Sequence, residues 1–217
     1  MRLVALVLLA ACGRPDAIAP SSTRALPAHD VVTLDASPKA RRRMVPPEVF
    51  LRAYLTWFGG LAPIDTFKKA RGWNLFDQWS DYLAALGLPD YHLDTPRVTQ
   101  SNAIMLATLG RLGEALCVRS VEHDLKRSTS PADRLVFVFD PIANPSLADF
   151  ATRFDVLHRL FLGYPAELAP DNRIARFHTL HHDVMTHHTT GQRLSPEDMG
   201  WAAVCTALIQ HPEAGLY

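Results

Sequence analysis

The clearest structural signal in this chain is the stretch at residues 144–163, NPSLADFATRFDVLHRLFLG. Its large apolar residues recur at alternating spacings of three and four, which is the period of one helix face. Ser146 stands at an N-cap position and Gly163 follows the last apolar residue, so both ends of a helix are marked. The residues on the predicted face are Leu147, Phe150, Phe154, Leu157 and Phe161.

Helix signals of the same kind recur on both sides of this stretch. A proline or a capping residue precedes most apolar runs, and glycine or proline follows them. We therefore predict a mainly α-helical fold, a compact bundle of six or seven helices with at most one short strand or hairpin. The further predicted helices cover residues 48–58, 65–71, 75–86, 96–116, 171–188 and 196–210.

Two local features qualify this pattern. Gly110 and Gly113 fall inside the long helix predicted from residue 96, where each costs about 1 kcal/mol relative to alanine, so we expect another element to pack closely there. Residues 135–139, LVFVF, are the only run with strong β-character. One strand cannot form a sheet, so this run pairs with a second copy, lies extended and buried, or forms a turn of helix.

The N-terminus has the form of an export signal. Arg2 precedes an apolar run at residues 3–10, which is about half of the ~20 residues that a membrane-spanning helix needs. The sequence that follows this pattern, Leu9-Ala10-Ala11-Cys12, resembles the lipobox of bacterial lipoproteins. The resemblance implies cleavage before Cys12 and lipidation of Cys12 by several acyl chains, which gives stable membrane attachment. The alternatives are an ordinary secretory signal or a chance apolar start.

The chain divides into three parts. Residues 1–11 are the predicted signal peptide, residues 12–46 a lipid-anchored flexible tether, and residues 47–217 a single helical domain. Residues 13–47 hold six prolines and no sustained apolar period, which is typical of a tether. The resemblance to lipoproteins implies an extracytoplasmic location, and Gly13 after the lipidated position fits delivery to the outer membrane, facing the periplasm or the cell surface.

The charge balance limits the class of partner. The 217 residues carry 22 Lys and Arg against 22 Asp and Glu, a formal net charge of zero. Binding nucleic acid requires a clustered excess of positive charge, so we expect no nucleic-acid partner.

A second resemblance concerns the C-terminal third. The segments Leu157–Pro165, Ser195–Asp198 and Trp201–Glu213 resemble the helical C-terminal module of large periplasmic proteins of unknown function that are associated with c-type cytochromes. This chain departs from that pattern at Tyr164 and Ala214, and it has no Cys-x-x-Cys-His motif, so no covalent c-type haem is expected. The resemblance implies no activity.

Two cysteines remain after lipidation. Cys117 and Cys205 both lie at partly apolar helical positions, and an extracytoplasmic pair favours a disulfide. The alternatives are two buried free thiols, which behave as small apolar side chains, or a reactive nucleophile.

Histidine is concentrated in one segment. Residues 178–188, HTLHHDVMTHH, hold five of the ten histidines. On a helix, His178, His181, His182 and Met185 fall within about 100° of one another, and imidazole with a thioether suits copper while imidazole alone suits zinc. These residues are our candidate site for copper, zinc or haem. The alternative is that they pack at the edge of the core or stay solvated.

The functional prediction rests on the predicted cellular location and the predicted fold. The sequence contains no hydrolase motif, no nucleotide-binding loop motif and no zinc-protease motif. We interpret Glu122, His123 and Asp124 as a solvated polar surface. We therefore predict a membrane-anchored accessory protein or interaction scaffold that is not an enzyme, has an envelope protein as its partner and requires no cofactor. The alternative function is a metal- or haem-binding module using residues 178–188.

Overall fold

The computed structural model describes residues 44–65, 72–89, 92, 100–127, 130–189 and 193–216. The predicted signal peptide, Cys12 and the tether up to residue 43 lie outside these ranges, as does nearly all of the helix predicted at residues 65–71.

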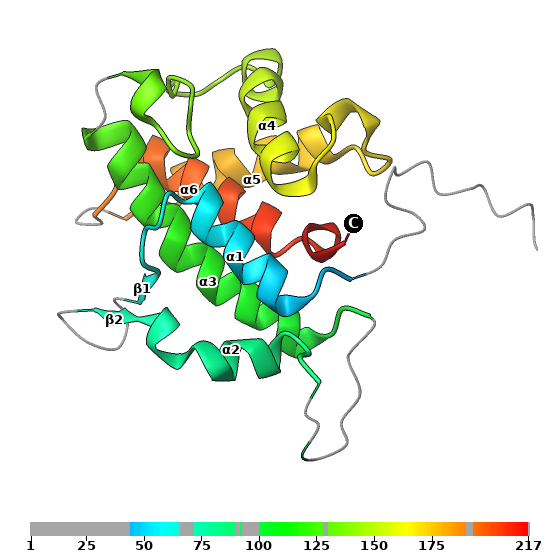
Figure 1. The fold of residues 1–217 in the computed structure, drawn as a ribbon. Coiled ribbons are helices and arrows are strands. Elements are labelled where there is room, and N and C mark those ends of the chain that lie inside the picture. Colours follow the sequence, from blue (N-terminus) through cyan, green and yellow to red (C-terminus); the bar gives the residue numbers. More distant parts are fainter. Residues whose placement is uncertain are drawn as a thin grey trace, which may run out of the picture. The chain divides into compact units, whose positions relative to one another are not determined.

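The prediction of a mainly α-helical fold is confirmed. The described residues form six α-helices, joined by short 3-10 turns, one π-helix and a pair of two-residue strands (Figure 1). The α-helices are α1 (Pro47–Trp57), α2 (Trp79–Ala85), α3 (Ala103–Val121), α4 (Leu147–Leu162), α5 (Arg173–Thr186) and α6 (Pro196–Ile209). The shorter elements are β1 (Ile64–Asp65), β2 (Trp73–Asn74), η1 (Leu75–Gln78), the π-helix η2 (Glu122–Arg127), η3 (Pro131–Asp133), η4 (Ala166–Leu168) and η5 (Pro212–Gly215).

The ends of the helices follow their capping residues. The Ser146 hydroxyl accepts the backbone N–H of Asp149 at 3.2 Å, and Gly163 ends α4 with a positive φ of 78°, as predicted. The sequence also allows a break in the long helix near Ser101, and residues 100–102 are not helical: the Asn102 side chain accepts the Met105 N–H at 3.0 Å and α3 begins at Ala103. The signal at Thr95-Pro96 falls outside the described residues.

Residues 135–139, for which the sequence left three alternatives open, form neither a strand nor a helical turn in the structure. The strands in the described part of the chain are β1 and β2, which pair antiparallel with Ile64 opposite Asn74. The segment is partly buried, with Val136 and Phe137 in the core and Val138 exposed, and its backbone bends at residues 135, 136 and 139. The buried Asp124 carboxylate accepts the backbone N–H groups of Leu135, Val136 and Phe137 at 2.7–3.0 Å. A side chain on η2 thus takes the donors that a neighbouring strand would otherwise use.

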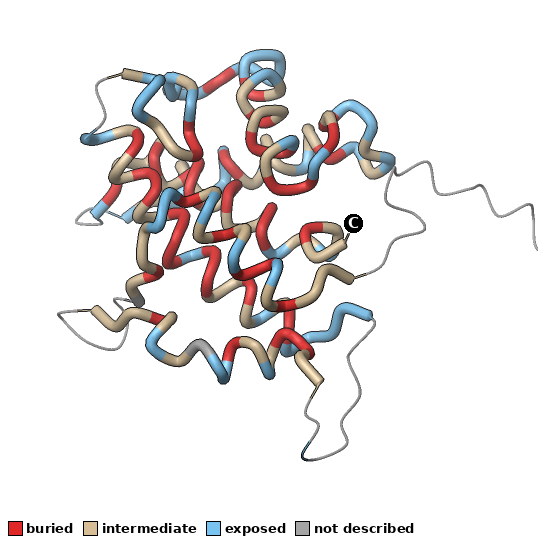
Figure 2. The backbone as a smooth tube through the Cα atoms, in the orientation of Figure 1, coloured by how far each residue is buried: buried red, intermediate tan, exposed pale blue. Residues whose placement is uncertain are grey.

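Helix α6 lies at the centre of the packing, in contact with both α3 and α5. The expected close approach at Gly113 is confirmed, since a Cβ atom there would lie 3.2 Å from the Ile209 side chain of α6. On the other side of α6, a Cβ atom at Gly200 would lie 2.9 Å from the His181 ring of α5. Figure 2 shows buried positions recurring along α1, α3 and α4 and through the helices behind them.

A disulfide joins α3 to α6. Cys117 and Cys205 are bonded, with their Cα atoms 5.9 Å apart and a separation of 88 positions in sequence. Both are fully buried in the hydrophobic core. The bond fixes the same helix pair that approaches closely at Gly113.

The folded domain begins before the predicted boundary at residue 47. Met44 forms an antiparallel bridge with Leu216, and the Val45 N–H donates to the Gly215 carbonyl at 2.8 Å. The last residues of the predicted tether therefore belong to the domain and lie beside its C-terminus. None of the described helices combines the length and apolar composition needed to cross a bilayer.

The disulfide gives a stability prediction. We expect Cys117→Ala/Cys205→Ala to lower the free energy of unfolding by roughly 2–5 kcal/mol, because the bond restricts a long loop in the unfolded chain. Urea denaturation with and without dithiothreitol measures this. Reductant should destabilise the wild type and leave the double variant unchanged; equal curves for the oxidised and reduced wild type would contradict the prediction.

Candidate functional site

A large groove lies between α3 and α6. Its volume is about 920 Å³, and its walls are mostly apolar or small side chains. Helix α3 contributes residues spaced three or four apart, which is one helix face, and α6 does the same. Residues lining it include Ala115 and Val118 of α3, Ala202, Ala203 and Ala207 of α6, and Leu194 in the loop before α6.

A second cavity of about 160 Å³ adjoins the groove at one end. Arg119 and Arg193 line both cavities, so the two are adjacent there. The smaller cavity is otherwise lined by Leu61, Glu122, His123 and Arg127. One end of an apolar groove therefore lies beside a smaller cavity that three arginine side chains help to line.

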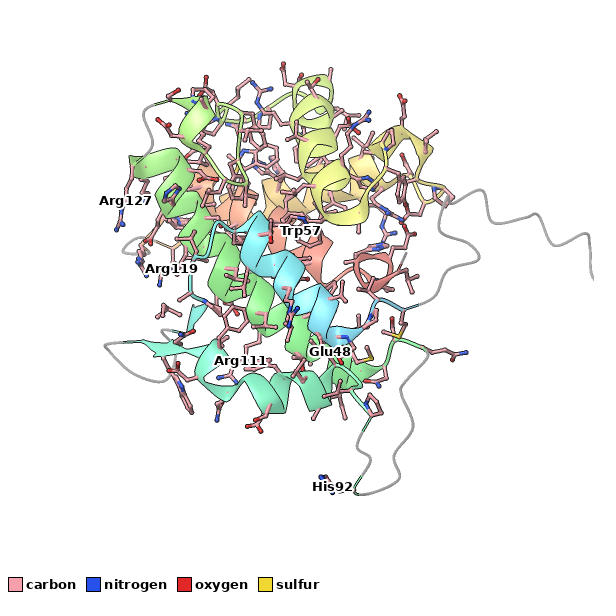
Figure 3. All side chains as sticks on the ribbon, viewed as in Figure 1. Glu48, Trp57, His92, Arg111, Arg119 and Arg127 are labelled. Carbon is pink, nitrogen blue, oxygen red and sulfur yellow. A yellow bond between two sulfur atoms is a disulfide. The ribbon has the colours of Figure 1, made fainter. Side chains whose placement is uncertain are left out.

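The arginines come from distant parts of the chain. Arg119 lies in the last turn of α3 and Arg127 at the end of η2, and both project to the same side of the molecule (Figure 3). Arg193, in the loop before α6, forms a two-point ion pair with Glu122, one contact of which is 2.6 Å. No ion pair joins Arg119 or Arg127 to another of the described residues. Three guanidinium groups thus face one carboxylate.

His123 is held in place by Asp124. The Nδ1–H of His123 donates to the Asp124 carboxylate at 2.7 Å, which fixes the proton on that nitrogen in the neutral ring. The interpretation of Glu122, His123 and Asp124 as a solvated surface is wrong for Asp124, which is fully buried. Three backbone N–H groups donate hydrogen bonds to its oxygens there.

The candidate metal ligands of α5 are not brought together. His178 Nε2 is hydrogen-bonded to the Pro145 carbonyl at 3.0 Å, His181 is buried in the core, the side chain of His182 is 59% exposed, and Met185 is half-buried. Within the described part of the chain, no three His, Cys, Asp or Glu side chains are arranged to hold a metal ion. The 100° sector of α5 that holds these four candidate ligands extends from the core to the solvent. Their side chains therefore point in different directions.

The environment of His181 is aromatic. Its ring lies against Trp201 and Phe150, with centroids 4.8 and 5.7 Å away, and close to Gly200. Its Nε2 atom is buried without a hydrogen-bond partner. Burial disfavours the charged imidazolium and lowers the pKa of His181 to about 4, with the nearby His178 acting in the same direction.

A buried polar cluster that the sequence analysis missed surrounds Arg173. Its guanidinium donates to Glu213 and to the Tyr164 hydroxyl at 3.0 Å, and to Nε2 of His158 at 3.2 Å. His158 Nδ1 in turn donates to the Tyr164 carbonyl at 2.7 Å, so the ring is neutral. Burial and the Arg173 charge lower the pKa of His158, and burial followed by Arg173 lowers the pKa of His211 to about 4. These contacts hold η5 against α4 and α5.

The buried histidine gives a pH prediction. The unfolded chain binds a proton at His181 between pH 6.5 and 4, and the folded chain does not, so stability falls as the pH is lowered through this range. From pH 7 to pH 5 we expect His181→Leu to lose about 2 kcal/mol less stability than the wild type.

Urea titrations at the two pH values measure this difference. The variant His182→Leu, at the exposed neighbouring histidine, is the matched control and should retain the wild-type pH dependence. A His181→Leu protein that loses as much stability as the wild type would show that the ring is not buried in its neutral form.

No protein-family model, curated protein or solved structure matches this chain. Function therefore has to be inferred from the chain's own surface. The groove between α3 and α6, with its arginine-lined end, is the feature of the described structure best suited to binding another molecule.

Proposed function

We propose that this chain is a bacterial envelope lipoprotein that acts as an accessory and not as an enzyme. Lipidated Cys12 anchors it to the membrane, the tether spans the distance from the surface, and the helical domain binds another component of the envelope in the groove between α3 and α6. The candidate metal ligands His178, His181 and His182 on α5 have no role in this proposal.

The groove is the observation that carries the proposal. Its volume of about 920 Å³ lies near the upper end of the range of ligand pockets, about 300–1,000 Å³, and apolar walls with a few charged groups are typical of such sites. A wall of small residues, with alanine at 115, 202, 203 and 207, leaves this space open along two packed helices. An accessory protein needs such a surface.

The compartment is supported by two separate observations. Residues 1–12 have the order of a lipoprotein signal, with a basic residue, an apolar run and small residues before a cysteine. The Cys117–Cys205 disulfide fits an oxidising compartment outside the cytoplasm, where such bonds form and persist.

The anchor is tested by labelling. A bacterium expressing the wild-type chain and given an alkyne analogue of palmitate should incorporate the label into this protein and retain the protein in the membrane fraction. Cys12→Ser should lose the label and move to the soluble fraction, since it lacks the thiol that receives the lipid. Cys205→Ser is the control and should keep the label; a labelled Cys12→Ser protein, or an unlabelled wild type, would reject the anchor.

The binding surface is tested by photocrosslinking in cells. A photoreactive amino acid in place of Ala203, which lines the groove, should form adducts with another envelope component. The same amino acid in place of the exposed Glu167 on η4 is the control and should form none. If position 203 gives no adduct in a folded, exported protein, the groove is not a binding surface and the proposal fails.

A further inference from the structure

We propose that the groove binds a long-chain fatty acid as its carboxylate anion. The acyl chain lies between α3 and α6, and the carboxylate lies in the smaller cavity among Arg119, Arg127 and Arg193. This inference rests on the proposed function and specifies the class of molecule that the groove takes.

The long part of the site suits an acyl chain. Its side chains from Ala115 and Val118 on one wall and Ala203 and Met199 on the other offer no hydrogen bond, so a polar ligand would lose its hydration there without replacement. An apolar chain gains free energy by leaving water along the same surface.

The charge along the groove is uneven. At one end Arg111 and Glu114 lie three residues apart on α3 and carry opposite charges. At the other end Arg119, Arg127 and Arg193 outnumber the carboxyl groups of Glu122 and of the buried Asp124 behind His123. Figure 3 shows Arg111, Arg119 and Arg127 in succession along α3 and η2. The positive excess is thus confined to one end, which matches a ligand with one anionic end.

The chemistry of the charged end favours a carboxylate. The planar guanidinium group of arginine pairs with a carboxylate through two parallel N–H donors. His123 lines the same cavity with its Nδ1–H already directed to Asp124, so its ring is fixed in orientation beside the arginines. Glu122, whose side chain is 13% exposed, already pairs with Arg193 and shows that a carboxylate is accommodated at this place.

The size of the smaller cavity limits the ligand. About 160 Å³ holds a compact charged group, whereas the groove of about 920 Å³ is open to a single extended chain. A helix of a partner protein would instead lay an apolar face along the groove, and an apolar face carries no anionic group for the positive excess at one end.

Binding is tested on the full chain carrying Cys12→Ser, exported to the periplasm and purified without detergent. The probe is sodium oleate below its micellar concentration, measured by equilibrium dialysis, with oleyl alcohol as the uncharged counterpart. Arg119→Gln/Arg127→Gln should weaken oleate binding by about 10-fold or more, since each charged hydrogen bond lost contributes about that factor. Its affinity for oleyl alcohol should stay within about threefold, the usual tolerance for changes at surface positions.

Two further variants separate the parts of the site. Ala203→Trp, which fills the groove, should weaken the binding of oleate and of oleyl alcohol alike. Arg52→Gln, at an exposed arginine of α1, is the matched control and should bind both as before. Circular dichroism of each variant establishes that it is folded.

The outcomes distinguish this inference from the function on which it rests. A folded protein that does not bind oleate, or an arginine double variant that binds it as well as the wild type, overturns the fatty-acid ligand. If position 203 nevertheless forms a protein adduct in cells, the accessory function stands with a different occupant. Binding of phosphatidylglycerol vesicles without binding of oleate also overturns the inference, because it indicates recognition of a lipid surface.

Discussion

The close packing of α6 between α3 and α5 is the constraint on which the domain depends. Gly113 lets the α3 backbone approach Ile209 of α6, and Gly200 lets the α6 backbone approach His181 of α5. The Cys117–Cys205 bond links the first of these pairs, α3 and α6, covalently. The groove lies along the same helix pair, where the small residues of α6 that do not touch α3 leave space. One pair of helices thus provides both the rigid contact and the opening beside it, so the walls of the groove are held by a cross-link.

Most of the helices could be predicted from the sequence because their signals are local. The Ser146 cap, the left-handed Gly163 and the alternating spacing of α4 all act within one segment. The central position of α6 could not be predicted, since this helix is apolar on nearly every side and shows no outward face. The conformation of residues 135–139, which the sequence left open, could not be predicted for a related reason. Their β-character is real, but a carboxylate eleven to thirteen residues away binds their N–H groups.

The candidate site was less accessible to sequence reasoning than the fold. Clustered histidines are conspicuous in a sequence, but helical spacing alone does not tell which of them face the core. His181 is buried in the core, whereas the next residue, His182, is exposed to solvent. The arginine-lined cavity has no such signal, because Arg119 and Arg193 are far apart in the chain and meet only through the packing of α6 on α3. The Arg173 cluster was missed for the same reason, since its partners Tyr164 and Glu213 belong to other elements.

If the chain is anchored at its N-terminus, as we propose, the bridge between Met44 and Leu216 bears on how the domain responds to pulling. Tension transmitted along the preceding residues would reach the domain at Met44 and Val45, and the first bonds to carry load would be those to Gly215 and Leu216. These residues follow directly on Glu213, which Arg173 holds against the ends of α4 and α5. Residues 44–45 and 215–216 are thus bonded to each other. A pull on the segment before Met44 would therefore load the C-terminal residues before it strains any helix of the bundle.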